Sequence, residues 1–133
     1  MAMTPQPIAP PATTFRAPRP EPATDARLPS LSIVLPCFNE AENVAAAVDE
    51  AQRAAMLFAR RHEVIIVDDG STDATAAVAE SIAAHDVRVR LVRHQHNRGY
   101  GAAVRTGISA SRHDWVLLTD ADIVHAPDAL RRL

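Results

Sequence analysis

The sequence contains no lysine, a single cysteine and only four glycines, and none of its apolar runs approaches the roughly 20 residues that a membrane-spanning helix needs. Without lysine there is no glycine-rich phosphate-binding loop of the Gly-Lys-Ser/Thr type, which argues against a phosphoryl-transfer domain of that kind. The lone Cys37 excludes an internal disulfide and fits a reducing, cytoplasmic compartment. The formal net charge of −2 predicts neither a nucleic-acid binder nor a polybasic membrane surface.

Proline is concentrated at one end of the chain. Seven of the ten prolines lie between Pro5 and Pro22, mixed with alanine, threonine and arginine. Such a composition buries too little apolar surface to offset the entropy of ordering. We therefore expect residues 1–28 to form a disordered arm and residues 29–133 to form the packed domain.

From Leu31 onward, short apolar runs alternate with helical patterns. The expected strands are 31–35, 63–67, 87–92 and 115–118, and the expected helices are an apolar stripe from Val44 to Phe58, then 74–84 and 101–109. For the first helix, Asn39 is the expected cap and Glu42 its capping-box partner. Alternation of this kind predicts an α/β domain with a mostly parallel, four-stranded, Rossmann-like sheet flanked by helices.

Two of the expected strands stop at closely spaced aspartates, in Val64–Gly70 (VIIVDDG) and Trp115–Asp122 (WVLLTDAD). Their apolar runs are typical of strands buried on both faces, and carboxylates are costly to bury, so the aspartates belong at the strand ends. The loops that follow parallel strands gather at one edge of the sheet, where open α/β sheets bind ligands. We therefore expect loops 36–40, 68–73, 94–101 and 120–125 to share that edge.

Asp120 and Asp122 leave an extended segment on the same face. Two carboxylates so close together suit a hard divalent cation, Mg²⁺ or Mn²⁺, whose other positions are filled by water and phosphate oxygens. Such an ion could neutralise a diphosphate leaving group. Taken alone, an Asp-x-Asp pair favours a solvated loop, and its position directly after a buried strand is what favours a cation site.

Other residues of these loops allow both a structural and a functional interpretation. Asp68 or Asp73 is expected to cap the second helix, which leaves Asp69 free to accept a hydrogen bond from a base. Phe38 offers a flat surface for a base or belongs to the core, and Glu40 accepts from base or ribose or merely favours a helix N-terminus. Cys37 is either a nucleophile or a small buried filler. The glycines of loop 97–101 permit close approach of the backbone to an anion. Arg98 and Arg105 are either phosphate contacts or solvated side chains.

Four motifs in order resemble the signature of family 2 glycosyltransferases. They are Val34–Glu40 (VLPCFNE), Val67–Asp73 (VDDGSTD), Asn97–Ala103 (NRGYGAA) and Asp120–Asp122 (DAD), within a match that covers Leu31–Leu133. Within the family, the chain is similar to the branch of dolichol-phosphate mannose synthases and bacterial polyprenyl-phosphate glycosyltransferases.

This resemblance implies a GT-A fold and an inverting, metal-assisted transfer of a sugar from a GDP- or UDP-linked donor to an acceptor, with a polyprenyl phosphate as the candidate acceptor. It assigns Pro36, Phe38, Glu40, Val67 and Asp69 to the nucleoside pocket. It assigns Asp120 and Ala121 to the ribose and diphosphate, and Asp122, with Asp120, to Mg²⁺ or Mn²⁺.

The chain departs from the family pattern in two side chains and in length. Phe38 stands where tyrosine is frequent, and Val124 stands where many relatives have a polar residue. Relatives continue beyond Leu133, where the general base is expected, so we expect an incomplete, donor-binding amino-terminal part and assign no catalytic base. The resemblance also implies a location at the cytoplasmic face of a membrane for the full-length protein. The alternative is a nucleotide-sugar-binding module or inactive fragment without catalysis.

Overall fold

The structure is a computed structural model that describes residue 4 and residues 26–121. The expected disordered arm therefore lies almost entirely outside the described residues, as does Asp122. The element order is β1 (Leu28–Cys37), α1 (Val44–Phe58), β2 (Ala59–Asp68), α2 (Thr75–His85), β3 (Val89–Arg93), α3 (Tyr100–Ala110) and β4 (Val116–Leu118). All seven expected elements are present, so the predicted α/β alternation is confirmed.

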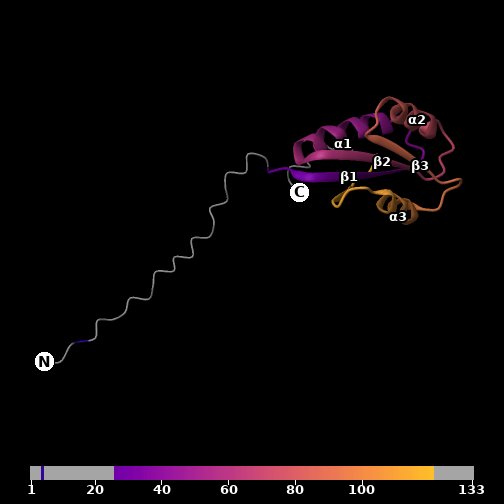
Figure 1. Cartoon of the computed structure of the whole chain (residues 1–133). Coiled ribbons are helices and arrows are strands. Elements are labelled where there is room, and N and C mark those ends of the chain that lie inside the picture. Colours follow the sequence, from indigo (N-terminus) through magenta and orange to yellow (C-terminus); the bar gives the residue numbers. More distant parts are fainter. Residues whose placement is uncertain (1–3, 5–25, 122–133) are drawn as a thin grey trace.

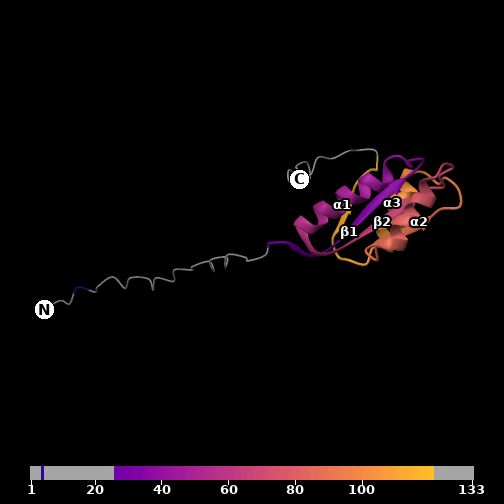
Figure 2. The same ribbon diagram turned by 90° about the horizontal axis from the view of Figure 1, so that it is seen from above.

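The four strands form one parallel sheet in the order β3-β2-β1-β4. The chain moves from β1 outward to β3 and then crosses back to place β4 on the other side of β1. Figure 1 shows the result of this reversal, with α1 and α2 covering one face of the sheet and α3 the other. Figure 2 views the same layers from above, the side on which α1 and α2 lie. Ligands of open parallel sheets bind at such a switch point, outside the carboxyl ends of the strands.

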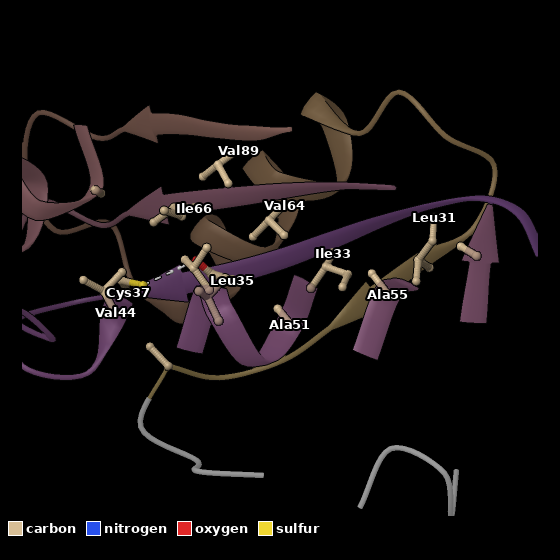
Figure 3. Close-up of a cluster of buried hydrophobic side chains, with 14 residues drawn as sticks. Leu31, Ile33, Leu35, Cys37, Val44, Ala51, Ala55, Val64, Ile66 and Val89 are labelled. Carbon is tan, nitrogen blue, oxygen red and sulfur yellow. Dashed lines mark hydrogen bonds between the residues drawn. The ribbon is translucent and has the colours of Figure 1, made fainter. Parts of the chain in front are cut away.

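The alternation of side chains along β1 and β2 divides the core between the two faces of the sheet. On the face of α1 and α2, β1 contributes every second residue from Leu31 to Cys37, and these pack with Val64 and Ile66 of β2. Figure 3 shows this cluster beside the helix stripe that includes Ala51 and Ala55. On the other face the members of the second cluster are Val34, Ile65, Val67 and Ala103. The prediction of strands buried on both faces is therefore confirmed for β2.

Strand β4 differs from that prediction. Its residues Val116 and Leu118 are 40% and 42% exposed, and the neighbouring Trp115 is 56% exposed. Of the described strands only β1 pairs with β4, and the paired segment is three residues long. The apolar run therefore indicated a strand correctly but overestimated its burial, because burial depends on what packs against an edge.

A buried carboxylate connects the sheet and α3 away from the carboxyl ends of the strands. Glu63 of β2 accepts hydrogen bonds from Ser32 Oγ of β1 at 2.7 Å, from the Arg112 N–H at 2.8 Å and from Arg90 Nε of β3 at 3.0 Å. The Arg90 guanidinium also donates to the carbonyl of Ala110, the last residue of α3. Because a buried charge is stable only when its acceptor sites are filled, this network fixes α3 against the strands that it crosses.

Candidate nucleotide pocket

An open pocket of about 440 Å³ lies at the carboxyl ends of the strands, on the switch-point side. Every one of the four loops predicted to gather there contributes to it, which confirms the geometric prediction. Its lining residues are Pro36, Cys37, Phe38, Glu40, Asp69, Asn97, Gly99, Tyr100, Ala103, Asp120 and Ala121.

Six of the residues assigned by the resemblance come together in this pocket: Pro36, Phe38, Glu40, Asp69, Asp120 and Ala121. Val67 is not among the lining residues, and its side chain is fully buried in the cluster under α3, so its assignment to the nucleoside pocket stays a prediction. Phe38 is 43% exposed, which removes the interpretation that its ring belongs to the core. Asp122 lies outside the described residues.

The Asp69 carboxylate is not the free acceptor that the sequence suggested. Its Oδ1 accepts from His94 Nδ1 at 2.7 Å and from the Arg98 N–H at 2.9 Å, and its Oδ2 accepts from the Gly99 N–H at 3.0 Å. Asp69 is only 4% exposed, although it lines the pocket. The sequence predicted that the backbone of loop 97–101 can approach an anion closely. It does so here, and the anion is the protein's own Asp69 carboxylate.

The surroundings of Asp69 keep it ionised. Burial alone raises the pKa of this carboxyl, but the hydrogen bonds from the Arg98 N–H, His94 and the Gly99 N–H outweigh burial and hold the pKa below its ordinary value. Since the folded pKa is depressed, these bonds stabilise the fold above the unfolded pKa, and this contribution disappears as the pH falls through the folded pKa. At neutral pH the pocket therefore contains a fixed negative charge.

Two loops are joined through Asn39, which does not cap α1 as expected. Asn39 has a φ of +52°, its Oδ1 accepts the Thr72 N–H at 2.9 Å, and its own N–H donates to Ser71 Oγ at 2.9 Å. The residue that precedes α1 is Asn43, which makes no side-chain capping hydrogen bond. The capping-box prediction is therefore wrong, because the side chain of Asn39 has partners distant in sequence. This connection holds the segment that carries Phe38 and Glu40.

The capping alternatives for α2 are separated by the structure. Asp73 Oδ1 accepts the N–H of Thr75, the first residue of α2, at 2.9 Å, which is the role expected of Asp68 or Asp73. Asp68 instead holds the turn, since its Oδ1 accepts the Ser71 N–H at 3.1 Å. Thr75 Oγ1 in turn accepts the Glu40 N–H at 2.8 Å, so the start of α2 also fixes the pocket rim.

Of the two interpretations of Cys37, a nucleophile or a small buried filler, the structure supports the second. The thiol is 3% exposed, and burial, together with the nearby Glu40 and Asp68 carboxylates, raises its pKa to about 12. Because the thiolate is the nucleophilic form, we expect native Cys37 to resist alkylation by iodoacetamide across pH 7–9, whereas denatured protein reacts readily. Mass spectrometry after timed quenching measures this, and rapid labelling of the native protein at pH 7 would contradict it.

Several site residues escaped sequence reasoning. Tyr100 and Asn97 lie in a loop that was singled out, but for its glycines and arginines rather than for these side chains. Neither Arg98 nor Arg105 is among the residues that line the pocket, although both were candidate phosphate contacts. His94, 7% exposed between Asp69 and Thr106, had no recognisable signal, because its partners are 25 and 12 residues away in the chain.

The donor set at the pocket fits a divalent cation that also binds a ligand's phosphates. Asp120 brings a carboxylate to the rim, and carboxylate oxygens are the ligands that Mg²⁺ and Mn²⁺ favour. Within residues 26–121, no group of three or more histidine, cysteine or acidic side chains could hold a metal by itself. Mg²⁺ usually needs only one or two carboxylates when phosphates and water complete its shell, so this set is sufficient with a diphosphate.

The fold and the pocket together define a Rossmann-like α/β domain with an acidic pocket at its switch point. The chain belongs to glycosyl transferase family 2, whose family model matches residues 32–133. The resemblance found in the four motifs is thereby confirmed.

Two known proteins are similar to this chain in sequence. The succinoglycan biosynthesis protein ExoO of Rhizobium meliloti (strain 1021) is 38% identical over 112 residues, which are 84% of this chain and 30% of that protein. The dodecaprenyl-phosphate galacturonate synthase of Rhizobium johnstonii is 37% identical over 98 residues, which are 73% of this chain and 29% of that protein. The chain thus spans less than a third of the length of either relative.

Solved structures agree with the fold. The mannosyltransferase PcManGT from Pyrobaculum calidifontis, in complex with GDP-Man and Mn²⁺, is 25% identical with a TM-score of 0.61, covering 78% of this chain and 32% of that chain. Glucosyl-3-phosphoglycerate synthase from Mycobacterium tuberculosis, in complex with Mn²⁺, UDP and glucosyl-3-phosphoglycerate, is 27% identical with a TM-score of 0.59, covering 74% and 36%. The structural neighbours are GT-A glycosyltransferases, as the resemblance implied.

Across the described part of the chain, every helix is too short or too polar to traverse a bilayer.

Proposed function

We propose that this chain is the donor-binding part of a metal-assisted, inverting glycosyltransferase that transfers a sugar from a nucleotide-diphosphate sugar to a polyprenyl phosphate. The observation that carries the proposal is the convergence of Phe38, Glu40, Asp69 and Asp120, from three separate loops, on one pocket at the switch point. The named relative that acts on dodecaprenyl phosphate supports the acceptor class, and the two complexes with Mn²⁺ support the cation. Such an acceptor also favours a location at the cytoplasmic face of a membrane for the whole protein.

The roles follow from the chemistry of the lining. The half-exposed ring of Phe38 stacks on the base, while Pro36 stiffens the strand end beneath it. Glu40 accepts from the ribose, and Asp120 with Ala121 contacts the ribose and diphosphate. Asp122 and Asp120 hold Mg²⁺ or Mn²⁺, which when bound supplies charge neutralisation for the departing diphosphate.

The test is calorimetric titration of the protein with UDP and with GDP, each with and without Mn²⁺. We expect Mn²⁺ to strengthen binding of at least one nucleotide about tenfold or more, a difference of about 1.4 kcal/mol. We expect Asp122→Ala to abolish this metal effect and Asp120→Asn to weaken it. Asp114→Ala is the matched control, since Asp114 is exposed and lies before β4 at the opposite end of that strand from the pocket.

Binding that is indifferent both to Mn²⁺ and to the Asp122 substitution would refute the donor-site proposal. Transfer from a labelled nucleotide sugar to a polyprenyl phosphate by the protein separates a transferase from a binding module without catalysis.

A further inference from the structure

The Asp69 carboxylate has few acceptor sites left for a ligand. An ionised carboxylate offers about four lone-pair positions, two on each oxygen. His94 and the Arg98 N–H occupy both positions on Oδ1, and the Gly99 N–H occupies one on Oδ2. One position therefore remains, on Oδ2, in a residue that lines the pocket.

His94 fixes this arrangement. Because an ionised carboxylate only accepts, the Nδ1 of His94 must carry the proton in the contact with Asp69. Its Nε2 lies 2.8 Å from Thr106 Oγ1 on α3, so both ring nitrogens have partners. His94 and Asp69 are 7% and 4% exposed, which leaves little freedom to rearrange these bonds when a ligand arrives.

Asn97 supplies the opposite kind of group beside Asp69. Its Oδ1 accepts the Gly99 N–H at 3.0 Å, which orients the side-chain amide and leaves its Nδ2 as the donor end. Asn97 lines the pocket. The pocket is lined by two further carboxylates, Asp120 and Glu40, and Glu40 has its Oε2 turned to Asn43 at 2.9 Å. The polar pattern around Asp69 is thus one acceptor position with an amide donor nearby.

Nucleobases differ in how they match this pattern. Uracil presents one N–H, at N3, between two carbonyl oxygens, whereas guanine presents two adjacent donors, N1–H and the N2 amino group. A carboxylate must offer both oxygens to pair with the guanine edge. At Asp69 the second guanine donor would face an oxygen that is already saturated, and an unpaired buried donor costs affinity.

We propose that the pocket selects a uracil nucleotide over a guanine nucleotide, with Asp69 accepting the single base N–H. His94 acts as the positioning residue, because its hydrogen bond to Oδ1 leaves that oxygen no acceptor position for the base. This inference rests on the proposed donor-binding function and names the donor class. The donors of the proposed transfer are therefore UDP-sugars.

The experiment compares UDP, CDP and GDP by calorimetric titration of the protein in Mn²⁺. We expect UDP to bind at least tenfold more tightly than either of the others, because cytosine has the size of uracil but lacks the N3–H. Equal or tighter binding of GDP would overturn the inference while leaving the donor-site proposal intact. Equal binding of CDP would also overturn it, since Asp69 would then not be used. Failure of all three to bind would instead refute the proposed function.

Two variants test the positioning role. His94→Phe removes the donor at Oδ1 while keeping a flat ring, so we expect the preference for UDP over GDP to shrink at least threefold, with GDP affinity unchanged or improved. Asn97→Ala should weaken UDP and leave GDP unchanged. If His94→Phe does not fold, as judged by circular dichroism and thermal unfolding, Thr106→Val loosens the same ring from its other side. A uniform loss of affinity for both nucleotides in His94→Phe or Thr106→Val would show a merely structural role.

Discussion

Gly70→Ala is expected to lower the free energy of unfolding by about 3 kcal/mol and to weaken nucleotide binding at least tenfold. Gly70 has a φ of +73°, and a Cβ built there would lie 2.4 Å from the carbonyl carbon of His96 and 2.5 Å from the nitrogen of Asn97. The backbone strain and the clash each cost about 1–3 kcal/mol. Because the clash is with backbone, the segment that brings Asn97 and Gly99 to the pocket must move.

Denaturant unfolding and titration with UDP measure the two effects. Gly99→Ala is the matched control, since Gly99 also has a positive φ, +95°, but a Cβ there meets nothing within 4 Å. Its stability loss therefore reports strain alone, at a φ of +95° and a ψ of +160° that only glycine adopts readily, so a larger loss in Gly70→Ala reports the clash. A loss below about 1 kcal/mol in Gly70→Ala would show that this close approach is absent in solution.

Gly107→Ala is expected to destabilise the fold by about 2–3 kcal/mol. A Cβ at Gly107 would lie 2.2 Å from Cγ1 of Val34, a side chain that is fully buried between β1 and α3. Overpacking of this kind forces a shift of the helix or a strained rotamer. Thermal or chemical denaturation measures the change.

The matched control for Gly107→Ala lies in the same helix. At Gly101 a Cβ meets only the Arg105 side chain, at 3.4 Å, so Gly101→Ala should stabilise α3 by about 0.5–1 kcal/mol. The double variant Val34→Ala with Gly107→Ala should cost less than the two single losses added together, because the shortened side chain leaves room. Simple additivity of the two losses would contradict the packing seen here.

The sequence was sufficient for the fold because the local patterns agreed with the tertiary structure. The apolar stripe that begins at Val44 and ends at Phe58 marks both bounds of α1, since its period matches a helix packed on one side. The predicted strand 31–35 is shorter than β1, which runs from Leu28 to Cys37, because the paired backbone extends beyond the apolar run. Burial of β4 was overestimated because an edge strand is covered only by what happens to pack on it.

The sequence predicted where the site lies in the fold, but not the hydrogen bonds between its residues. Strand ends mark the pocket residues Asp69 and Asp120, but no local pattern shows that three donors from a loop about 25–30 residues away surround Asp69. The same limit explains Asn39, whose helix-capping pattern is used instead to hold Thr72. Residue types alone did not separate guanine from uracil, whereas counting the occupied lone pairs of one carboxylate gives a preference that can be measured.

The reversal of strand order between β1 and β4 has a mechanical consequence. The pocket floor, at Pro36 and Cys37, belongs to the central strand, and one wall, at Tyr100 and Ala103, belongs to a helix on a single face of the sheet. A small translation of that helix would change the width of the mouth while the floor stays in place. The same movement would also displace the groups that read the base, because Gly99 at the start of the helix donates to Asp69 and Thr106 within it contacts His94.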